Sequence, residues 1–197
     1  MSRKEHPVIF VGAGPGDPDL ITVKGQRALN EADRIIYAGS LVPEALLKWA
    51  DSKAEIFNSA SMDLKEIVDS LVEGFNESKR VVRLHTGDPS LYGAIFEQML
   101  ELDERSIPYK VVPGVTASFA AAASMKLEYT LPEITQTLII TRIAGRTPVP
   151  EAEALASLAS HQASMAIYLS IKQIESRRHT HADNERAIRE VAIRTDR

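Results

Sequence analysis

The sequence predicts an α/β fold whose N-terminal half is built on a mostly parallel sheet. Short β-branched apolar runs alternate with segments whose apolar residues recur every three or four positions. Strands that alternate with helices in this way pair in parallel through right-handed crossovers. Two of the apolar runs also lead directly into glycine-rich loops, which is typical of the strand ends where α/β proteins bind small molecules.

Five strands are expected in the first half, at residues 8–11, 35–37, 54–57, 81–84 and 109–112. A helix is expected between the third and the fourth strand, because one helical face collects Leu64, Ile67, Val68, Leu71, Val72 and Phe75. Asp63 precedes this face and Glu66 follows three residues later, in the pattern of a capping box. A second helix is expected around Ile95, Phe96, Met99 and Leu100.

Pro113-Gly114 interrupts the alternation, so we expect an N-terminal α/β domain over residues 1–113. Residues 114–170 begin a second α/β domain, with a helix over 116–125, a strand at 137–141, a helix from Glu151 and a strand at 165–169. Residues 171–197 form a charged, divergent tail that holds no glycine, proline or aromatic residue. We expect one short helix between Asp183 and Ala192 there, which leaves the second domain incomplete.

Composition excludes several classes of function. The 197 residues include no cysteine, which rules out disulfides, thiolate catalysis and cysteine-based metal sites. A net charge of -4 argues against a broad nucleic-acid surface. No apolar run approaches the roughly 18 residues needed to span a membrane. We therefore expect a cytoplasmic protein that binds neither nucleic acid nor membrane.

The first glycine-rich loop, at residues 12–18, does not fit a dinucleotide site. Such a site needs a third glycine where Asp17 stands, and an acidic residue after the second strand, where the chain reads Tyr37-Ala38-Gly39. Taken alone, the loop fits a ligand site and a simple strand-to-helix turn equally well.

The second loop, Thr86-Gly87-Asp88-Pro89, favours a small-molecule site. Gly87 permits a ligand to approach the backbone closely. Asp88 offers a carboxylate that suits an ammonium or lies well beside a sulfonium, and S-adenosylmethionine carries both groups. Asp88 is equally placed to cap a helix that begins near Ser90 or Leu91. The two roles are compatible, since a cap uses one carboxylate oxygen.

Taken together, residues 12–18, 86–93 and 112–117 resemble the ordered motifs of the tetrapyrrole methylases. The chain is identified as a member of this family over residues 7–170. Four further segments resemble the branch that methylates C11 of precorrin-4, or of its cobalt form, in cobalamin biosynthesis: 37–42, 58–62, 85–88 and 141–148. The resemblance implies two α/β domains that bind S-adenosylmethionine between them, and a homodimer.

The resemblance also implies which residues contact the methyl donor. By position they are Pro15, Thr86, Gly87, Asp88, Leu91, Thr116, Ala117 and Leu169. The aspartate proposed as a base in the uroporphyrinogen methylases falls at Ala38, so no catalytic base is assigned. Methyl transfer from a sulfonium depends chiefly on alignment, which is worth on the order of 7–11 kcal/mol.

The implied acceptor is a tetrapyrrole that bears many carboxylates. Arg142 and Arg146 are candidate contacts, because arginine binds carboxylates in bidentate fashion, although solvated surface charges explain them equally well. Lys24 and Arg27 are expected on the surface of the first helix. His179-Thr180-His181 offers no third ligand, so we expect no protein-bound metal, and any cobalt would arrive within the substrate.

Two alternatives stay open. Family members continue where this chain departs, near Ser170, so the chain could be a truncated, non-catalytic paralogue. A methylase of the same fold could also act on another acceptor, such as ribosomal RNA or diphthine. The corrin-type motifs around Ser40 and Ser61 argue against that second alternative.

Overall fold

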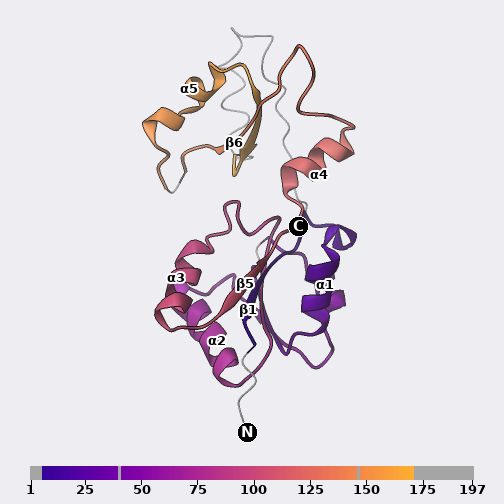
Figure 1. Cartoon of the computed structure of the whole chain (residues 1–197), viewed down its shortest axis with the longest axis vertical. Coiled ribbons are helices and arrows are strands. Elements are labelled where there is room, and N and C mark those ends of the chain that lie inside the picture. The colour runs from indigo at the N-terminus through magenta and orange to yellow at the C-terminus, as the bar shows by residue number, and fades with distance from the viewer. Residues whose placement is uncertain (1–5, 40, 146, 171–197) are drawn as a thin grey trace. The chain divides into compact units, whose positions relative to one another are not determined.

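The structure is a computed structural model that describes residues 6–39, 41–145 and 147–170 (Figure 1). The chain divides into two compact units, of which the first ends at Ala117 and the second begins at Ser118. The charged tail expected over 171–197, with its short helix, lies outside the described residues. None of the helices in the described ranges is long and apolar enough to cross a membrane.

The first unit is built on a five-stranded sheet. In spatial order its strands are β3 (Glu55–Asn58), β2 (Arg34–Tyr37), β4 (Val81–His85), β1 (Val8–Gly12) and β5 (Tyr109–Val112). Every neighbouring pair is parallel, with Ile9 of β1 opposite Val82 on one side and Lys110 on the other. The central strands are buried and the two edge strands are partly exposed. The predicted parallel α/β arrangement is therefore confirmed.

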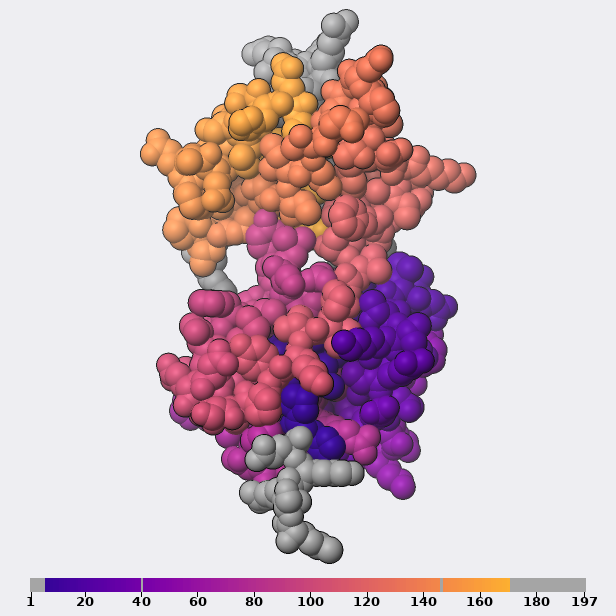
Figure 2. Space-filling model, in the orientation of Figure 1, coloured from indigo at the N-terminus to yellow at the C-terminus, as the bar shows by residue number. Residues whose placement is uncertain are grey.

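Helices cover both faces of this sheet (Figure 1). One face is covered by α1 (Val23–Asn30) and the 3-10 helices η1 (Pro18–Leu20) and η2 (Glu44–Trp49), and the other by α2 (Leu64–Asn76) and α3 (Phe96–Glu104). Figure 2 shows the same division at the surface of the first unit, with violet residues around α1 on one flank and pink residues around α3 on the other.

The order of the strands fixes which face each connection uses. The chain runs from β1 through β2 to β3 by way of α1 and η2, and returns through β4 to β5 by way of α2 and α3. Right-handed crossovers place these outward and return connections on opposite faces. Strands β1 and β4 are neighbours, yet the chain leaves them toward opposite faces. Their C-terminal ends therefore form a topological switch point, the usual position of a ligand in such sheets.

Helix α2 has the predicted N-terminus. The Glu66 N–H donates to Asp63 Oδ1 at 2.8 Å, and the Asp63 N–H donates to Glu66 Oε2 at 2.8 Å. This reciprocal pair is a capping box, and it satisfies two amides that have no partner within the helix. The buried face of the helix includes Ile67, Val68 and Leu71, as the apolar spacing predicts.

Helix α3 begins later than the predicted capping role of Asp88 requires. It starts at Phe96, and residues 89–92 form turns and 93–95 are irregular where a first helical turn was expected. Tyr92 and Ala94 have positive φ angles of 55° and 48° in this segment. These left-handed conformations interrupt a helix, so the expected start near residue 90 is wrong.

The buried face of α3 also differs from the apolar pattern. Phe96 and Leu100 are 63% and 46% exposed, whereas Gln98 and Leu102 are buried. The polar Gln98 faces inward because its Oε1 accepts a hydrogen bond from Nε of the buried Arg83 at 3.2 Å. A tertiary partner thus decides the orientation of this helix.

The second unit contains a two-stranded parallel sheet. Its elements are α4 (Ala117–Ser124), β6 (Leu138–Arg142), the 3-10 helix η3 (Glu151–Glu153), α5 (Leu155–Ala159) and β7 (Ser164–Tyr168). Both strands lie within one residue of their predicted positions. The helix expected from Glu151 is a 3-10 turn followed by a short α-helix, and neither has a side-chain cap to extend it.

Candidate functional site

Three loops meet at the C-terminal ends of β1, β4 and β5. The Gly14 N–H donates to the Gly87 carbonyl at 3.2 Å, and the Gly87 N–H donates to the Gly14 carbonyl at 2.8 Å. The third loop joins them through Asp88, whose Oδ2 accepts a hydrogen bond from the Gly114 N–H at 2.9 Å. The two glycine-rich loops singled out in the sequence are therefore neighbours at the topological switch point.

Close backbone packing explains why glycine stands at the ends of these strands. A Cβ on Gly114 would lie 2.1 Å from the Gly87 carbonyl oxygen and 2.9 Å from the Gly12 Cα. A Cβ on Gly12 would lie 2.6 Å from the Gly114 nitrogen. Neither position can accept a side chain unless the loops separate. Sequence reasoning missed Gly12 and Gly114 as site residues, although a glycine at or just after each of three strand ends was a usable signal.

Asp88 holds this loop cluster together. Its Oδ1 accepts from the Ser90 N–H at 2.8 Å, which closes a turn, and its Oδ2 accepts from the Gly114 N–H. Both oxygens are thus used by backbone amides, where one was expected to cap a helix. A carboxylate offers about four acceptor positions, so Asp88 keeps the capacity to accept from a ligand ammonium.

Seven of the eight predicted donor contacts belong to the first unit: Pro15, Thr86, Gly87, Asp88, Leu91, Thr116 and Ala117. Gly87 links them, since its loop bonds to that of Pro15, and a Cβ built on it would lie 3.8 Å from the Thr116 Cα. Leu91 lies in the turn closed by Asp88. The eighth residue, Leu169, follows β7 in the second unit, with a positive φ of 56° and 68% exposure.

Of the two candidate substrate arginines, Arg142 lies within the described residues. Arg142 is neither free nor fully solvated, because its guanidinium donates to the carbonyls of Thr147 at 3.2 Å and Pro148 at 2.9 Å. It therefore braces the loop that follows β6. Arg146 lies outside the described residues. Lys24 and Arg27 are exposed on α1, as predicted.

Two buried polar residues of β4, Arg83 and His85, were not predicted from the sequence as part of the site. Arg83 donates to the Ile36 carbonyl at 3.2 Å, to Ser59 Oγ at 3.0 Å and to Gln98. These partners are all neutral, and burial lowers the pKa of Arg83 to about 10. Arg83 and His85 alternate with the apolar Val82 and Leu84, and alternate residues of a strand share one face. This alternation could have identified the two polar residues from the sequence.

His85 is the second of these residues, and it directly precedes the Thr86-Gly87-Asp88 loop. Its ring stacks on Phe10, with centroids 6.0 Å apart. Its Nε2 is buried and has no hydrogen-bond partner. Burial first, and the charge of Arg83 second, lower the pKa of His85 to about 3. The imidazole is therefore neutral at pH 7 and supports the loop by packing.

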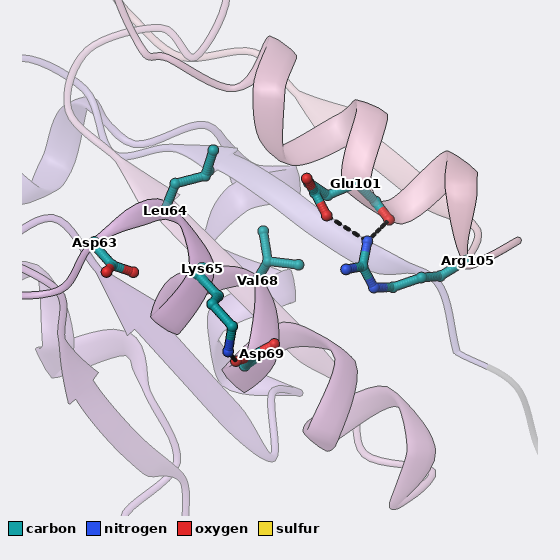
Figure 3. Close-up of a pocket in the computed structure, with 7 residues that line it drawn as sticks. All are labelled: Asp63, Leu64, Lys65, Val68, Asp69, Glu101 and Arg105. Carbon is teal, nitrogen blue, oxygen red and sulfur yellow. Dashed lines mark hydrogen bonds and ion pairs between the residues drawn. The ribbon is translucent and has the colours of Figure 1, made fainter.

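A surface hollow of about 350 Å³ lies elsewhere, between α2 and α3 (Figure 3). It is lined by Asp63, Leu64, Lys65, Val68, Asp69, Glu101 and Arg105. Figure 3 shows two ion pairs among its charged side chains, Lys65 with Asp69, at 2.6 Å, and Arg105 with Glu101. None of the predicted donor or substrate contacts that the structure describes lines this hollow. Within the described ranges, no three histidine, aspartate or glutamate side chains gather as a metal site would require.

Comparison with known proteins defines the class to which this fold and loop cluster belong. The sequence model of the Tetrapyrrole (Corrin/Porphyrin) Methylases matches residues 7–194. The chain therefore belongs to the tetrapyrrole methylase family, as its motifs indicate.

Particular relatives are more specific. The chain is 60% identical over 168 residues to the cobalt-precorrin-4 C(11)-methyltransferase of Methanocaldococcus jannaschii, covering 85% of this chain and 65% of the relative. It is 53% identical over 167 residues to the precorrin-4 C(11)-methyltransferase of Pseudomonas aeruginosa, covering 85% and 66%. The chain thus spans about two thirds of the length of these relatives.

Solved structures share the fold. The cobalamin biosynthetic enzyme cobalt precorrin-4 methyltransferase, CbiF, matches with a TM-score of 0.82 and 49% identity, covering 85% of this chain and 70% of that one. The uroporphyrin-III C-methyl transferase of Thermus thermophilus, solved with S-adenosylhomocysteine, matches with a TM-score of 0.67 and 27% identity, covering 93% and 73%.

Proposed function

We propose that the chain uses S-adenosylmethionine to methylate C11 of precorrin-4, or of its cobalt form, in cobalamin biosynthesis. The observation that carries this proposal is the meeting of three glycine-bearing loops at the switch point of the sheet, with Gly12, Gly87 and Gly114 in backbone contact. The names of relatives that are 60% and 53% identical support the acceptor and the position of the methyl group.

The charge of the loop cluster supports the methyl donor as its ligand. Glycine at positions 87 and 114 lets the three loops pack backbone against backbone, with the Gly87 N–H bonded to Gly14 and the Gly114 N–H bonded to Asp88. Asp88 supplies a carboxylate, half-buried and fixed by two amides, for the ammonium of the methionine part. Pro15, Leu91, Thr116, Ala117 and Leu169 are the further proposed contacts.

In this reaction the protein chiefly aligns the methyl donor with the acceptor and excludes water from the site. S-adenosylmethionine would supply an activated methyl group: the C–C bond to the electron-rich ring carbon forms as the S–CH3 bond breaks, and S-adenosylhomocysteine leaves with that electron pair. Rigid backbone loops hold one reactant in line with the other, which accounts for a barrier reduction on the order of 7–11 kcal/mol without a catalytic base. Arg142 and Arg146 are proposed to bind carboxylates of the acceptor. Arg142 has five N–H donors, of which the Ile143, Thr147 and Pro148 carbonyls use three.

We propose further that the enzyme is a cytoplasmic homodimer without a protein-bound metal, and that any cobalt enters with the tetrapyrrole. The absence of cysteine suits a reducing compartment. Sedimentation equilibrium tests the dimer, since the chain has a mass of 21.7 kDa and the dimer twice that. A single species at the monomer mass would contradict this part of the proposal.

The decisive experiment is calorimetric titration with S-adenosylhomocysteine. We expect saturable binding to the wild-type chain, and a loss of at least about tenfold in affinity in Asp88→Ala, because a charge-assisted contact is worth about 1.5–3 kcal/mol. The matched control is Asp69→Ala, which removes a carboxylate of the same charge from the exposed Lys65 pair on α2. If neither the wild-type chain nor Asp88→Ala released heat on titration, the proposal would be contradicted.

Turnover identifies the acceptor. Precorrin-4, cobalt-precorrin-4, ribosomal RNA and the diphthine precursor are each incubated with S-adenosylmethionine carrying a labelled methyl group. We expect label in a tetrapyrrole only, at C11 by NMR. Label in RNA or in the diphthine precursor would favour another acceptor. Donor binding without any transfer would favour a non-catalytic member of the family.

A further inference from the structure

The start of helix α4 is tied to strand β7 by a tyrosine hydroxyl. The Ser118 N–H donates to Tyr168 Oη at 3.0 Å, and Tyr168 Oη donates to Ser118 Oγ at 2.9 Å. Tyr129 Oη donates to the Ser118 carbonyl at 2.8 Å. The amide, hydroxyl and carbonyl of Ser118 are thus all bonded to tyrosines, and the residue is 6% exposed.

Such a contact has a clear physical role at a helix start. The first amides of a helix have no partner within it, and a serine, threonine or aspartate just before the helix usually satisfies one of them. Here an amide of the first turn of α4 is satisfied by Tyr168, fifty positions further along the chain. A tyrosine side chain has only two rotatable bonds, so this hydroxyl fixes the position of the helix start closely.

The chain neighbours of Ser118 and Tyr168 indicate what the hydrogen bonds between these residues do. Ser118 directly follows Thr116 and Ala117, and Tyr168 directly precedes Leu169. All three neighbours are proposed contacts of the methyl donor. Leu169 has a positive φ of 56°, a conformation that is unfavourable for a non-glycine residue, and an anchored strand end helps to hold it.

We infer that Tyr168 is a positioning residue for the methyl donor, acting through the Ser118 backbone on Thr116–Ala117 and through its own backbone on Leu169. This inference rests on the proposed function. Tyr168 need not touch the donor. Its hydroxyl sets the place of two short segments that do, which lie far apart in the sequence.

Tyr129 provides a matched control within the same network. Its hydroxyl makes one hydrogen bond to Ser118, where that of Tyr168 makes two, and neither of its chain neighbours is a proposed donor contact. Its carbonyl accepts from Ser164 Oγ at 2.7 Å, so its backbone stays anchored when the hydroxyl is removed. Tyr168→Phe and Tyr129→Phe therefore each delete one hydroxyl from the same serine.

The test compares these two variants. Tyr168→Phe should weaken binding of S-adenosylhomocysteine about tenfold and raise the KM for S-adenosylmethionine similarly, with the KM for the tetrapyrrole unchanged. Tyr129→Phe should leave both values within about threefold, and the thermal stability of each variant is measured alongside. Hydrogen exchange of the Ser118 amide should quicken in Tyr168→Phe and not in Tyr129→Phe.

The possible results distinguish a failure of the positioning role of Tyr168 from a failure of the proposed function. Equal losses of affinity in the two variants, or a loss in Tyr168→Phe that only follows its stability, would overturn the inference while wild-type binding upholds the proposed function. A wild-type chain that binds no S-adenosylhomocysteine would overturn both. A tenfold effect confined to Tyr168→Phe would support the positioning role.

Discussion

Gly12, Gly87 and Gly114 show that the loop cluster depends on backbone atoms as much as on side chains. The contacts among them are made by main-chain nitrogen, carbon and oxygen atoms, and Asp88 fixes the arrangement by accepting two amides. A substitution there acts by displacing a loop, even where it leaves every charged group in place. Substitutions of these glycines are therefore expected to act through steric overlap.

Gly114→Ala should destabilise the chain and abolish donor binding. The new Cβ would lie 2.1 Å from the Gly87 carbonyl oxygen, which real contacts do not allow, so the loops must separate. Overpacking of this kind costs roughly 1–3 kcal/mol. Gly145→Ala is the control, since a Cβ there meets nothing within 4 Å. Urea unfolding measures the first effect and calorimetry the second. Wild-type affinity in Gly114→Ala would contradict the close packing.

His85 should make stability depend on pH below neutrality. Its folded pKa is about 3 against an ordinary 6.5, so between these values the unfolded chain binds a proton that the folded chain does not. The stabilisation is complete above pH 6.5 and is lost as the pH falls toward 3. By linkage, the free energy of unfolding should drop by about 1 kcal/mol between about pH 7 and pH 5.5.

His85→Gln removes this titrating group and should flatten that part of the profile. Urea unfolding, followed by the fluorescence of Trp49, the single tryptophan, measures both proteins at each pH. The comparison concerns the slope with pH, so a uniform loss of stability in the variant does not affect it. Identical slopes in the two proteins would show that His85 is protonated without difficulty in the folded chain.

At the scale of elements, local signals predicted structure well and tertiary contacts overrode them elsewhere. The capping box and apolar face of α2 were predictable because Asp63 and Glu66 act within one turn. The start of α3 was not, because Asp88 bonds to Gly114, a residue twenty-six positions away. No spacing in the sequence reveals that partner.

The candidate site divides in the same way. Glycines after the strands predicted the two loops that meet, since the carboxyl ends of parallel strands share one edge of the sheet. The contact of Ser118 with Tyr168 joins residues fifty positions apart and left no local pattern. Arg142 was identified as a cation, but the carbonyls that its guanidinium binds could not be foreseen.

The capping box gives a prediction about α2. Asp63→Ala should lower the free energy of unfolding by about 1 kcal/mol, because it leaves the Glu66 amide without its partner. Asp69→Ala removes the same charge from the same helix, yet its exposed pair with Lys65 contributes little to stability. Urea unfolding of both variants checks the difference. Equal losses would mean that charge, and not capping, stabilises the helix.

At the scale of the whole molecule, the proposed donor contacts are divided between the two compact units. The loops at residues 15, 86–91 and 116–117 belong to the first unit, and Leu169 belongs to the second. A ligand that binds the folded state stabilises whatever it contacts, by about 2.7 kcal/mol at a hundred times its Kd. The segments that donor binding stabilises therefore show whether the contacts with the donor are confined to the first unit or include Leu169 of the second.

Saturating S-adenosylhomocysteine should slow hydrogen exchange in both units of the wild-type chain. The amides of residues 86–88 and 114–117 should be protected because the proposed contacts lie there, and those of residues 168–169 because Leu169 is one of them. The amides of α2 (Leu64–Asn76), which line the separate hollow, serve as an internal control and should change least. Protection of the first unit alone would remove Leu169 from the contacts while keeping the three loops. The affected segments thus show, independently of turnover, how much of the chain takes part in binding the donor.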